Sequence, residues 1–417
     1  MKWIVVLIIG LTIASCCIER PKVLCYYADG TLITDSTHLN LIYRKLPNLL
    51  SQERIDSADI KIYTSLESGL TDVLTKEITR LQDTIYPHVK WEHRETKTLM
   101  DSLKAINQFL NVSVVAIDNK TGQVVVHYSN RSKSSADFVT NRGPIGGMNK
   151  TLLYTLAMQK EFTPYDRYPQ MRRDFNSDFY NMVPDSTINR SFLRAFSISF
   201  GGDPSRGLAE QYSDKQAYAF LLMLLREGHI ENYSSLLFLF DAQLSLLDLT
   251  KTWSAFYNKG IRNEPTVINR IVNFKGKELY RRKAHSTRIL DEQTAEEMLH
   301  LLDYYSHLGR GTVVHRKFPN SPDFIGNFGG LGSGNSGGYF IAITGDFTIG
   351  IRCITNDWRI RLRGGDYNQE KIPLTVPFWL KCIENLRKSR PNKSDELKPL
   401  YKYRTFIQEE KVPEIEI

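Results

Sequence analysis

The sequence predicts an α+β fold, in which an antiparallel sheet is flanked by helices and carries a helical subdomain. Three observations support this class. Two stretches, one near residue 112 and one near residue 337, have the alternating apolar pattern and turn residues of β-hairpins. Between them, apolar residues recur at helical spacing. This order of elements, with strands near both ends of the chain and helices between them, indicates one sheet with helices packed on it.

The first predicted strand is a β-branched and aromatic stretch at residues 60–63. It turns through Thr64 and Ser65 into a helix whose apolar positions recur every three or four residues. Either Thr64 or Ser65 is expected to cap that helix. The preceding residues 18–58 are mixed and polar with weak periodicity, and they predict a lead-in segment or stalk without an assigned function.

The later elements follow from the same patterns. The first hairpin is expected to pair residues 112–117 with 123–127 around a turn at 118–122, and the second hairpin to turn at 344–346. Predicted helices are residues 217–225, 236–256 and 377–388.

The N-terminus, MKWIVVLIIGLTIASCC, has the pattern of a secretory signal. A lysine precedes an apolar run that is too short to span a bilayer comfortably, and small residues lead to Cys16. The sequence Ile13-Ala14-Ser15-Cys16 resembles the bacterial lipobox, which implies that residues 1–15 are removed and that Cys16 carries the lipid. The alternative is an uncleaved anchor. In both cases the rest of the chain is expected outside the cytoplasm, on the periplasmic side of the envelope.

The amino-acid composition limits the classes of molecule that this chain is expected to bind. A net charge of +8 favours an anionic neighbourhood such as phospholipid headgroups or cell-wall polymer, but acidic residues are interspersed and no long basic block is present, so no nucleic acid is expected. The remaining cysteines have no C-x-x-C spacing for zinc, although this compartment permits a disulfide. They are Cys17, Cys25, Cys353 and Cys382.

Five segments occur in an order that resembles a known family. They are IYTSLESGLTDVLTKEITRL, VVAIDNKTGQVVV, GPIGGMNKTLLYTLAMQKEFTPYD, SSLLFLFDAQLSLLDLTKTWSAFYNKG and LDEQTAEEMLHLLDYYSHLGRGT. Together they resemble the transpeptidase part of class A penicillin-binding proteins, which have a serine β-lactamase-like fold. The resemblance implies a lead-in at residues 16–58, a transpeptidase-like domain at 59–389 and a charged tail at 390–417. No glycosyltransferase portion is expected before the domain.

That family needs three motifs. A serine in S-x-x-K attacks the carbonyl carbon of a peptide, the lysine takes its proton, and S-x-N and K-T-G line the cleft. The first motif falls on residues 147–150, where Lys150 is kept and glycine replaces the serine. Since glycine has no hydroxyl to acylate, the resemblance implies a degenerate site. The matching positions are Gly147, Lys150, Ser197, Ser199, Gly330, Leu331, Gly332 and Ser333.

The second and third motifs are also altered. Ser199 stands in place of the asparagine, and Gly330 and Leu331 replace the lysine and the hydroxyl that in the family help to hold the carboxylate of the substrate. Backbone groups of Gly332 and Ser333 remain, and the amide of Gly147 is able to form part of an oxyanion hole.

The chain contains no intact copy of the first motif at any other position. No lysine in the chain has a serine or threonine three residues before it, so there is no intact S-x-x-K. A literal K-T-G at residues 120–122 lies at the predicted tip of the first hairpin and is interpreted as a solvated turn, and S-x-N at 333–335 is interpreted as accidental. A displaced nucleophile is the remaining catalytic alternative, and its candidates are the loop residues Ser132, Ser134 and Ser135.

Two further site predictions follow. Without a hydroxyl to deprotonate, Lys150 is expected to be a structural ammonium bonded to hydroxyls such as that of Ser197 and to carbonyls. No metal site and no cofactor are expected, because the histidines lack metal-ligand spacing. These histidines are His285, His300, His307 and His315.

The sequence therefore predicts a lipid-anchored periplasmic pseudo-transpeptidase, a non-catalytic binding or scaffolding protein in peptidoglycan and cell-envelope assembly. Its expected partners are peptidoglycan or envelope proteins, and the membrane through the N-terminal lipid. Two alternatives stay open: an active D,D-transpeptidase or carboxypeptidase-type acyl enzyme with a displaced serine, and a structural envelope lipoprotein that uses surface contacts only.

Overall fold

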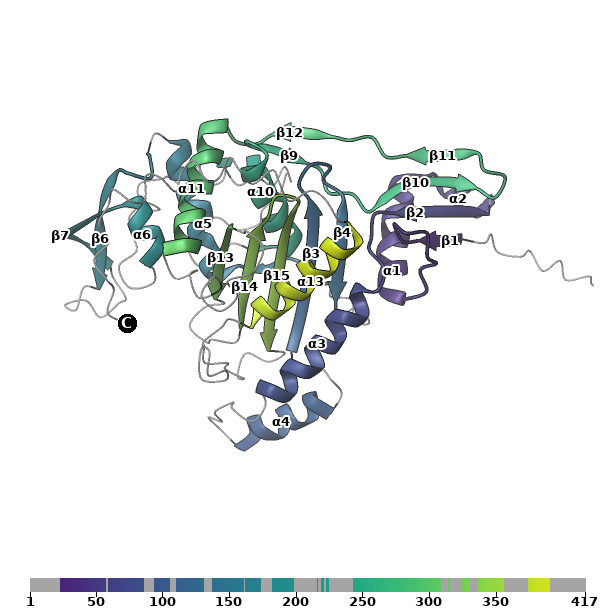
Figure 1. Ribbon diagram of the computed structural model, residues 1–417, viewed down its shortest axis with the longest axis horizontal. Helices are drawn as coiled ribbons and strands as arrows, with labels where there is room; N and C mark the ends of the chain where they lie inside the picture. The colour runs from purple at the N-terminus through teal and green to yellow at the C-terminus, as the bar shows by residue number, and fades with distance from the viewer. Residues whose placement is uncertain are drawn as a thin grey trace, which may run out of the picture.

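The molecule is built around a five-stranded sheet (Figure 1). Its strands, in spatial order, are β13 (Ile325–Gly330), β14 (Gly337–Ile343), β15 (Phe347–Thr355), β3 (Leu110–Asp118) and β4 (Val124–Ser129). All neighbouring pairs are antiparallel. The computed structural model describes residues 23–57, 59–85, 94–105, 110–130, 137–160, 162–173, 182–198, 216, 219–220, 223–224, 243–308, 314, 325–330, 337–355 and 374–390.

Both predicted hairpins are confirmed. β3 pairs with β4 around the turn at residues 119–122, and β14 pairs with β15 around residues 344–346. β15 then pairs with β3 along its whole length, which joins the two hairpins into one sheet. β3 is buried along its whole length and β15 along nearly all of it, and this explains why their sequences are rich in valine and isoleucine.

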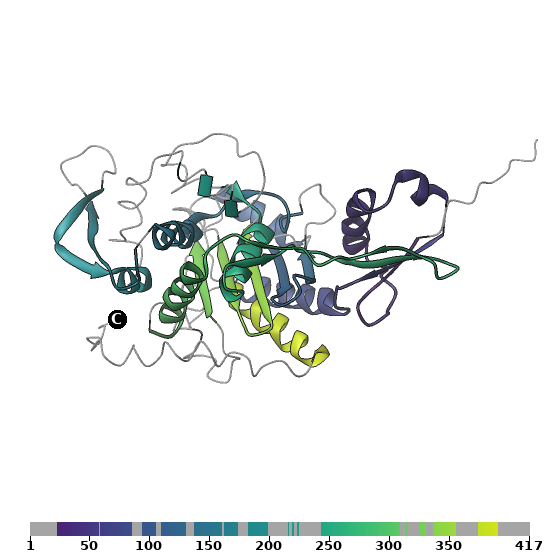
Figure 2. The same ribbon diagram turned by 90° about the horizontal axis from the view of Figure 1, so that it is seen from above.

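Helices cover both faces of the sheet (Figures 1 and 2). The first face packs against α5 (Asn149–Gln159), α10 (Leu246–Tyr257) and α11 (Glu292–Leu308), together with α6 (Phe192–Ile198). The second face packs against α3 (Leu70–Ile85), α4 (Arg94–Ala105) and α13 (Thr375–Ser389). On β3, Val115 and Ile117 face the first layer while Val112 and Val114 face the second. The predicted α+β class is confirmed.

Helix α10 lies directly on the sheet at Gly350 of β15. A β-carbon at position 350 would overlap the Thr250 hydroxyl oxygen and lie 3.2 Å from Leu246 Cδ1. Only glycine therefore permits this close approach of helix and strand. Trp253 and Phe256, on the same helix, are completely buried in the first layer.

Two details of the sequence prediction are wrong, while the closing helix is confirmed as α13. Thr64 is the last residue of β2 (Ile60–Thr64), and the Ser65 hydroxyl donates to the carbonyl oxygen of Val124 at 2.7 Å. Helix α3 begins only at Leu70, so neither residue caps it. The helix predicted at 236–256 begins at Leu246, after the short strand β8 (Gln243–Leu244); residues 236–242 and most of 217–225 lie outside the described residues.

A second, four-stranded sheet lies beside the main body (Figure 2). Its strands, in order, are β1 (Val23–Tyr26), β2, β10 (Ile268–Asn273) and β11 (Glu278–Arg281). Residues 23–57 of the predicted lead-in are thus folded, and they also form α1 (Ser36–Lys45), the 3-10 turn η1 (Leu46–Asn48) and α2 (Gln52–Ser57). Ile42, Ile62 and Ile271 meet in the core of this small unit.

A long hairpin connects the two parts. It leaves the end of α10 as β9 (Ile261–Asn263), continues as β10 and β11, and returns as β12 (Ser286–Arg288), which pairs with β9 (Figure 1). A separate pair, β6 (Arg167–Arg173) with β7 (Met182–Ser191), lies at the opposite end of the molecule.

Hydrogen bonds join the small sheet and the long hairpin to the main body. His38 Nε2, on α1, donates to the carbonyl oxygen of His127 on β4 at 2.8 Å. Asn263 Nδ2 donates to the carbonyl oxygen of Asn119, at the turn of the first hairpin, at 2.9 Å. The literal K-T-G at residues 120–122 lies in this turn, as expected, and Gly122 is packed against the backbone of Asn263.

Three cysteines lie within the described residues, and all are buried free thiols: Cys25, Cys353 and Cys382. Burial raises the pKa of Cys353 and of Cys382 to about 12, so both thiols stay protonated at neutral pH. None of these three takes part in a disulfide. Within the described part of the chain, no helix is both long and apolar enough to span a membrane.

The contact at Gly350 gives a test of the fold. We expect Gly350→Ala to lower the free energy of unfolding by about 1–3 kcal/mol, because α10 has to move away from β15 to admit a methyl group. Urea denaturation measures this difference. Gly143→Ala is the matched control, since a β-carbon there would make an ordinary contact 3.8 Å from the Arg352 side chain. Equal stability of the Gly350 variant and the parent would contradict this packing.

Candidate functional site

The first motif position lies in the turn that opens α5. Residues Gly146–Met148 form a 3-10 turn, η3, and α5 begins at Asn149, which confirms the predicted helix start. Gly146 has a φ angle of +51°, in the left-handed region that favours glycine. Gly147 is partly buried and offers only backbone groups. Lys150 follows on the first turn of the helix, in the place expected from the motif.

The turn is held in place from two sides. Just before it, β5 (Gly143–Pro144) pairs with β8, and the Tyr339 hydroxyl on β14 donates to the carbonyl oxygen of Pro144 at 3.2 Å. On the other side, η3 packs against β13. The first motif position therefore faces the strand that carries Gly330, as the family arrangement requires.

Lys150 is bound by backbone carbonyls of α6. Its Nζ donates to the carbonyl oxygen of Ala195 at 3.1 Å and to that of Phe196 at 2.8 Å. The same nitrogen lies 5.6 Å from the ring centroid of Tyr154 and 5.0 Å from that of Phe196. Carbonyl oxygens and ring faces both favour the positively charged form of the amine. Lys150 thus fastens α5 to α6 through two donated hydrogen bonds and two contacts with ring faces.

The second motif is placed beside Lys150. Ser197 is buried near the end of α6, directly after Phe196, and its hydroxyl donates to the carbonyl oxygen of Arg194 at 2.8 Å. The expected carbonyl contacts of Lys150 are present. The expected proximity to Ser197 arises because Lys150 binds the two residues that precede it.

Of the third motif, only Gly330 lies within the described residues. Gly330 ends β13 and pairs with Gly338 of β14. Several predicted positions lie outside the described residues, namely Ser199, Leu331, Gly332, Ser333, the lipid-attachment residue Cys16 and the alternative nucleophiles Ser132, Ser134 and Ser135. Among the residues described, no three His, Cys, Asp or Glu side chains are grouped as metal ligands.

Solved structures have this arrangement of sheet, helices and turn. Penicillin-binding protein 1A from Haemophilus influenzae matches with a TM-score of 0.67 at 12% identity, over 87% of this chain and 72% of that chain. PonA1 from Mycobacterium tuberculosis matches with 0.65 at 11% identity, over 85% and 92%. A peptidoglycan synthetase from Bifidobacterium adolescentis matches with 0.56 at 12% identity, over 82% and 64%. This chain has the fold of the penicillin-binding protein transpeptidases.

No protein-family model and no curated protein sequence matches the chain. The likeness is therefore one of backbone arrangement, since only 11% to 12% of residues are identical in the matches above. In proteins of one fold, the packing pattern of sheet and helices outlasts the individual side chains, and function has to be argued from the site.

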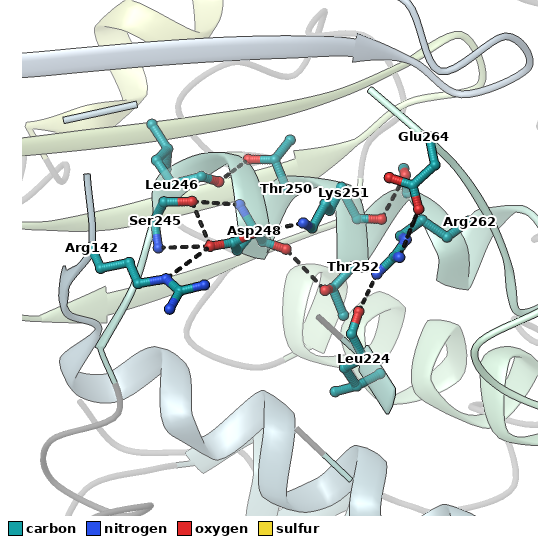
Figure 3. Close-up of polar contacts among 11 residues, drawn as sticks. Arg142, Leu224, Ser245, Leu246, Asp248, Thr250, Lys251, Thr252, Arg262 and Glu264 are labelled. Atoms are coloured by element: carbon teal, nitrogen blue, oxygen red, sulfur yellow. Dashed lines mark hydrogen bonds and ion pairs between the residues drawn. The ribbon is translucent and has the colours of Figure 1, made fainter. Parts of the chain in front are cut away.

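The turn of this penicillin-binding-protein fold also rests on a buried ion pair that the sequence analysis missed (Figure 3). At the start of α10, Asp248 Oδ1 lies 2.7 Å from Lys251 Nζ, and both side chains are less than a tenth exposed. Asp248 Oδ2 accepts from the Ser245 hydroxyl at 2.7 Å, while the amide of Asp248 donates to Ser245 Oγ at 3.0 Å. These contacts form a capping box at the N-terminus of α10.

The ion pair reaches the glycine-rich turn through Arg142. The Nε of Arg142 lies 4.0 Å from Asp248 Oδ2, and Arg142 directly precedes β5 (Figure 3). Burial alone would raise the pKa of Asp248, but the Lys251 ammonium and the Ser245 donors outweigh it and hold that pKa below its ordinary value. Asp248 is therefore ionised at neutral pH and binds the start of α10 to the strand that leads into Gly147.

A sequence signal for this network exists. Ser245 and Asp248 have the S-x-x-D spacing of a capping box, and Lys251 follows one turn later. The long apolar stretch at 236–256 concealed this signal, because it suggested a helix that had already begun before Ser245.

The ion pair gives the second test. We expect Lys251→Met to lower the free energy of unfolding at pH 7 by about 3 kcal/mol or more, because a buried carboxylate loses its cation. The matched control is Lys259→Met, which breaks an exposed pair with Glu292 and should cost under about 1 kcal/mol. Thermal or urea denaturation measures both.

The pH dependence has a definite sign. A carboxyl group whose pKa is lowered by folding stabilises the protein above its unfolded pKa of about 3.9, and this contribution is lost as the pH falls through the folded value. In Lys251→Met the buried carboxyl keeps only the effect of burial, which raises its pKa, so the difference between the parent and this variant should be largest at and above neutral pH and shrink steadily as the pH falls to about 4 and below. A difference that grows with acid would contradict the assigned charge state.

Proposed function

We propose that this chain is a lipid-anchored, periplasmic pseudo-transpeptidase, which binds peptidoglycan or envelope proteins without catalysing acyl transfer. The observation that carries the proposal is the pairing of Gly147 with Lys150. The position where the family has its nucleophile carries no side chain, and the neighbouring amine is held as an ammonium by two carbonyl oxygens.

Chemistry supports this function over an acyl enzyme. Nucleophilic catalysis needs a hydroxyl or thiol within hydrogen-bonding distance of a base. Lys150 Nζ instead donates to the carbonyl oxygens of Ala195 and Phe196, and the hydroxyl of Ser197 donates to that of Arg194. Both groups donate to backbone carbonyl oxygens, and we infer that these bonds serve the packing of α5 against α6 rather than acyl transfer.

The retained support of the turn favours a binding role. The β5–β8 pair, the Tyr339 hydroxyl and the buried Asp248–Lys251 pair all fix the segment that leads into Gly147. A surface held this firmly loses little conformational freedom when a ligand binds. The solved neighbours include a peptidoglycan synthetase and penicillin-binding proteins, and this supports peptidoglycan as the ligand class.

The first prediction of this function concerns acylation. After incubation of the full chain with penicillin, we expect intact-mass spectrometry to show no covalent adduct, because Gly147 has no nucleophile. The matched variant is the triple substitution Gly147→Ser, Gly330→Lys and Leu331→Thr, which restores the family residues and is expected to acylate slowly.

Two other outcomes of this experiment would contradict the proposal. A stoichiometric adduct on the parent chain, mapped to any serine, would overturn the pseudoenzyme assignment and favour the displaced-nucleophile alternative. A folded triple variant that remains unlabelled would contradict the placement of the three motifs.

The second prediction concerns binding. We expect the chain to co-sediment with purified peptidoglycan, and we expect Gly147→Phe to reduce the bound fraction about ten-fold, because the ring would occupy the space in front of the turn. Gly147 is partly exposed and its φ is not positive, so the variant is expected to fold. The control is Lys120→Gln, at the remote tip of the first hairpin. If the parent does not co-sediment, the chain is better described as an envelope lipoprotein that uses other surface contacts.

A further inference from the structure

The two long strands of the hairpin and the turn between them are rich in basic residues. Residues 268–283 hold six basic residues and one acidic residue, a net charge of +5 within sixteen residues, whereas the whole chain of 417 residues carries +8. The basic residues are Arg270, Lys275, Lys277, Arg281, Arg282 and Lys283. This element is therefore strongly basic for its length.

The turn at the end of this hairpin combines two lysines with an aromatic ring. Phe274 is 39% exposed, although large apolar side chains are usually buried, and Lys275 and Lys277 are exposed beside it. The Nζ of Lys61, on the neighbouring strand β2, lies 5.1 Å from the centroid of the Phe274 ring. The turn therefore presents an apolar group surrounded by cations.

Nearby acidic residues do not cancel this charge. Glu278 accepts from Arg281 Nε at 2.9 Å, so each largely neutralises the other. Asp59 is the other acidic residue next to the turn in sequence or strand pairing. The backbone amide of Phe274 donates to the backbone carbonyl oxygen of Asp59 at 3.2 Å. By sequence and strand pairing, Lys61, Lys275 and Lys277 therefore lie near the same turn as Asp59.

The strand register places this turn next to the N-terminus of the described chain. Val23 of β1 is paired with Ile60 of β2, and Ile60 is paired on its other side with Asn273 of β10. The turn follows Asn273 directly. The chain therefore enters the small sheet at the end where the basic turn projects, and both views place this end away from the main body (Figures 1 and 2).

The length of the preceding segment limits how far this end lies from a membrane. Cys16 is seven residues before Val23, a distance of at most about 25 Å in a fully extended chain. If the N-terminus is held by a lipid on Cys16 or by an uncleaved apolar anchor, Val23 and its neighbour Asn273 stay close to the bilayer. This step rests on the anchoring included in the proposed function.

We propose that the turn at residues 274–277 is a membrane-contact site, which binds the headgroups of anionic phospholipids. Lys275, Lys277 and Lys61 are attracted to the negative surface potential, and Phe274 enters the interfacial region between headgroups and acyl chains. Contact at this second point fixes the orientation of the small sheet on the membrane and holds the transpeptidase-like body at a set distance from it.

A bilayer fits this surface better than a glycan does. Sugar binding uses exposed aromatic faces, but the ring of Tyr63 on the open face of the small sheet is already covered. Tyr26 stacks on it with a centroid distance of 5.2 Å, and the Arg270 guanidinium lies 4.3 Å from its centroid. The exposed ring of Phe274 lies on a projecting turn between Lys61 and Lys275, which suits insertion into an interface.

The test measures membrane binding without the anchor. The chain from residue 16 onward, with Cys16→Ser, keeps every described residue and carries no lipid. We expect it to co-sediment with vesicles of phosphatidylcholine containing about one-third phosphatidylglycerol, not with pure phosphatidylcholine, and to be released by about 0.5 M salt. We expect Lys275→Gln with Lys277→Gln to reduce the bound fraction roughly ten-fold, and Phe274→Ser several-fold.

The matched control is Lys76→Gln with Lys97→Gln, which removes two exposed lysines from α3 and α4, away from the hairpin. It should bind like the parent. Circular dichroism checks that all variants are folded. Four results would each overturn this site. The hairpin variant binds vesicles as well as the parent does, or the parent binds neutral vesicles. The parent binds no vesicles, or the hairpin variant loses binding to peptidoglycan instead of binding to vesicles. Fractionation of cells that express Cys16→Ala tests the anchor separately, so a failed anchor and a failed surface are distinguishable.

Discussion

The close contact between α10 and β15 at Gly350 is the constraint on which the rest of the structure depends. It brings the helix onto the middle of the sheet, where Trp253 and Phe256 fill the first layer of the core. The N-terminal end of the same helix holds the glycine-rich turn through the Asp248 ion pair and the β8–β5 pairing. Its C-terminal end continues into the long hairpin that completes the small sheet. One helix thus links the main sheet, the segment that leads into Gly147 and the N-terminal unit.

In this penicillin-binding-protein fold, Gly147 lies on the turn that opens α5 and offers only backbone groups. Lys150 has contacts that stabilise its charged form, and these contacts join α5 to α6. In an acyl enzyme a lysine at this point has to exchange a proton, so its environment has to balance two protonation states. Here the amine donates to two backbone carbonyl oxygens of α6. The turn, the strand opposite it and the helix behind it remain in the family arrangement.

The distribution of charge links the two ends of the molecule. At the site, the single negative charge of Asp248 is shared by the Lys251 ammonium, at 2.7 Å, and Arg142 Nε, at 4.0 Å. The segment 268–283, beside the N-terminus of the small sheet, carries a net charge of +5. In the proposed arrangement, electrostatic attraction to an anionic surface acts on this segment, and the body that carries Gly147 stays at a distance from the surface.

The sequence by itself determined the two hairpins, the closing helix, the α+β class and the placement of Gly147 before Lys150, because these depend on local periodicity, turn residues and motif spacing. Tertiary structure alone decided the rest. The start of α3 at Leu70 depends on Ser65 bonding to β4, and α10 begins at Leu246, with Ser245 as its N-cap, because β8 pairs with β5. The lead-in became a sheet because β2 and β10 supply its partners, and β10 is more than 200 residues away in sequence. Pairing energy between distant strands leaves no periodic signal in either strand alone, so only the folded chain reveals it.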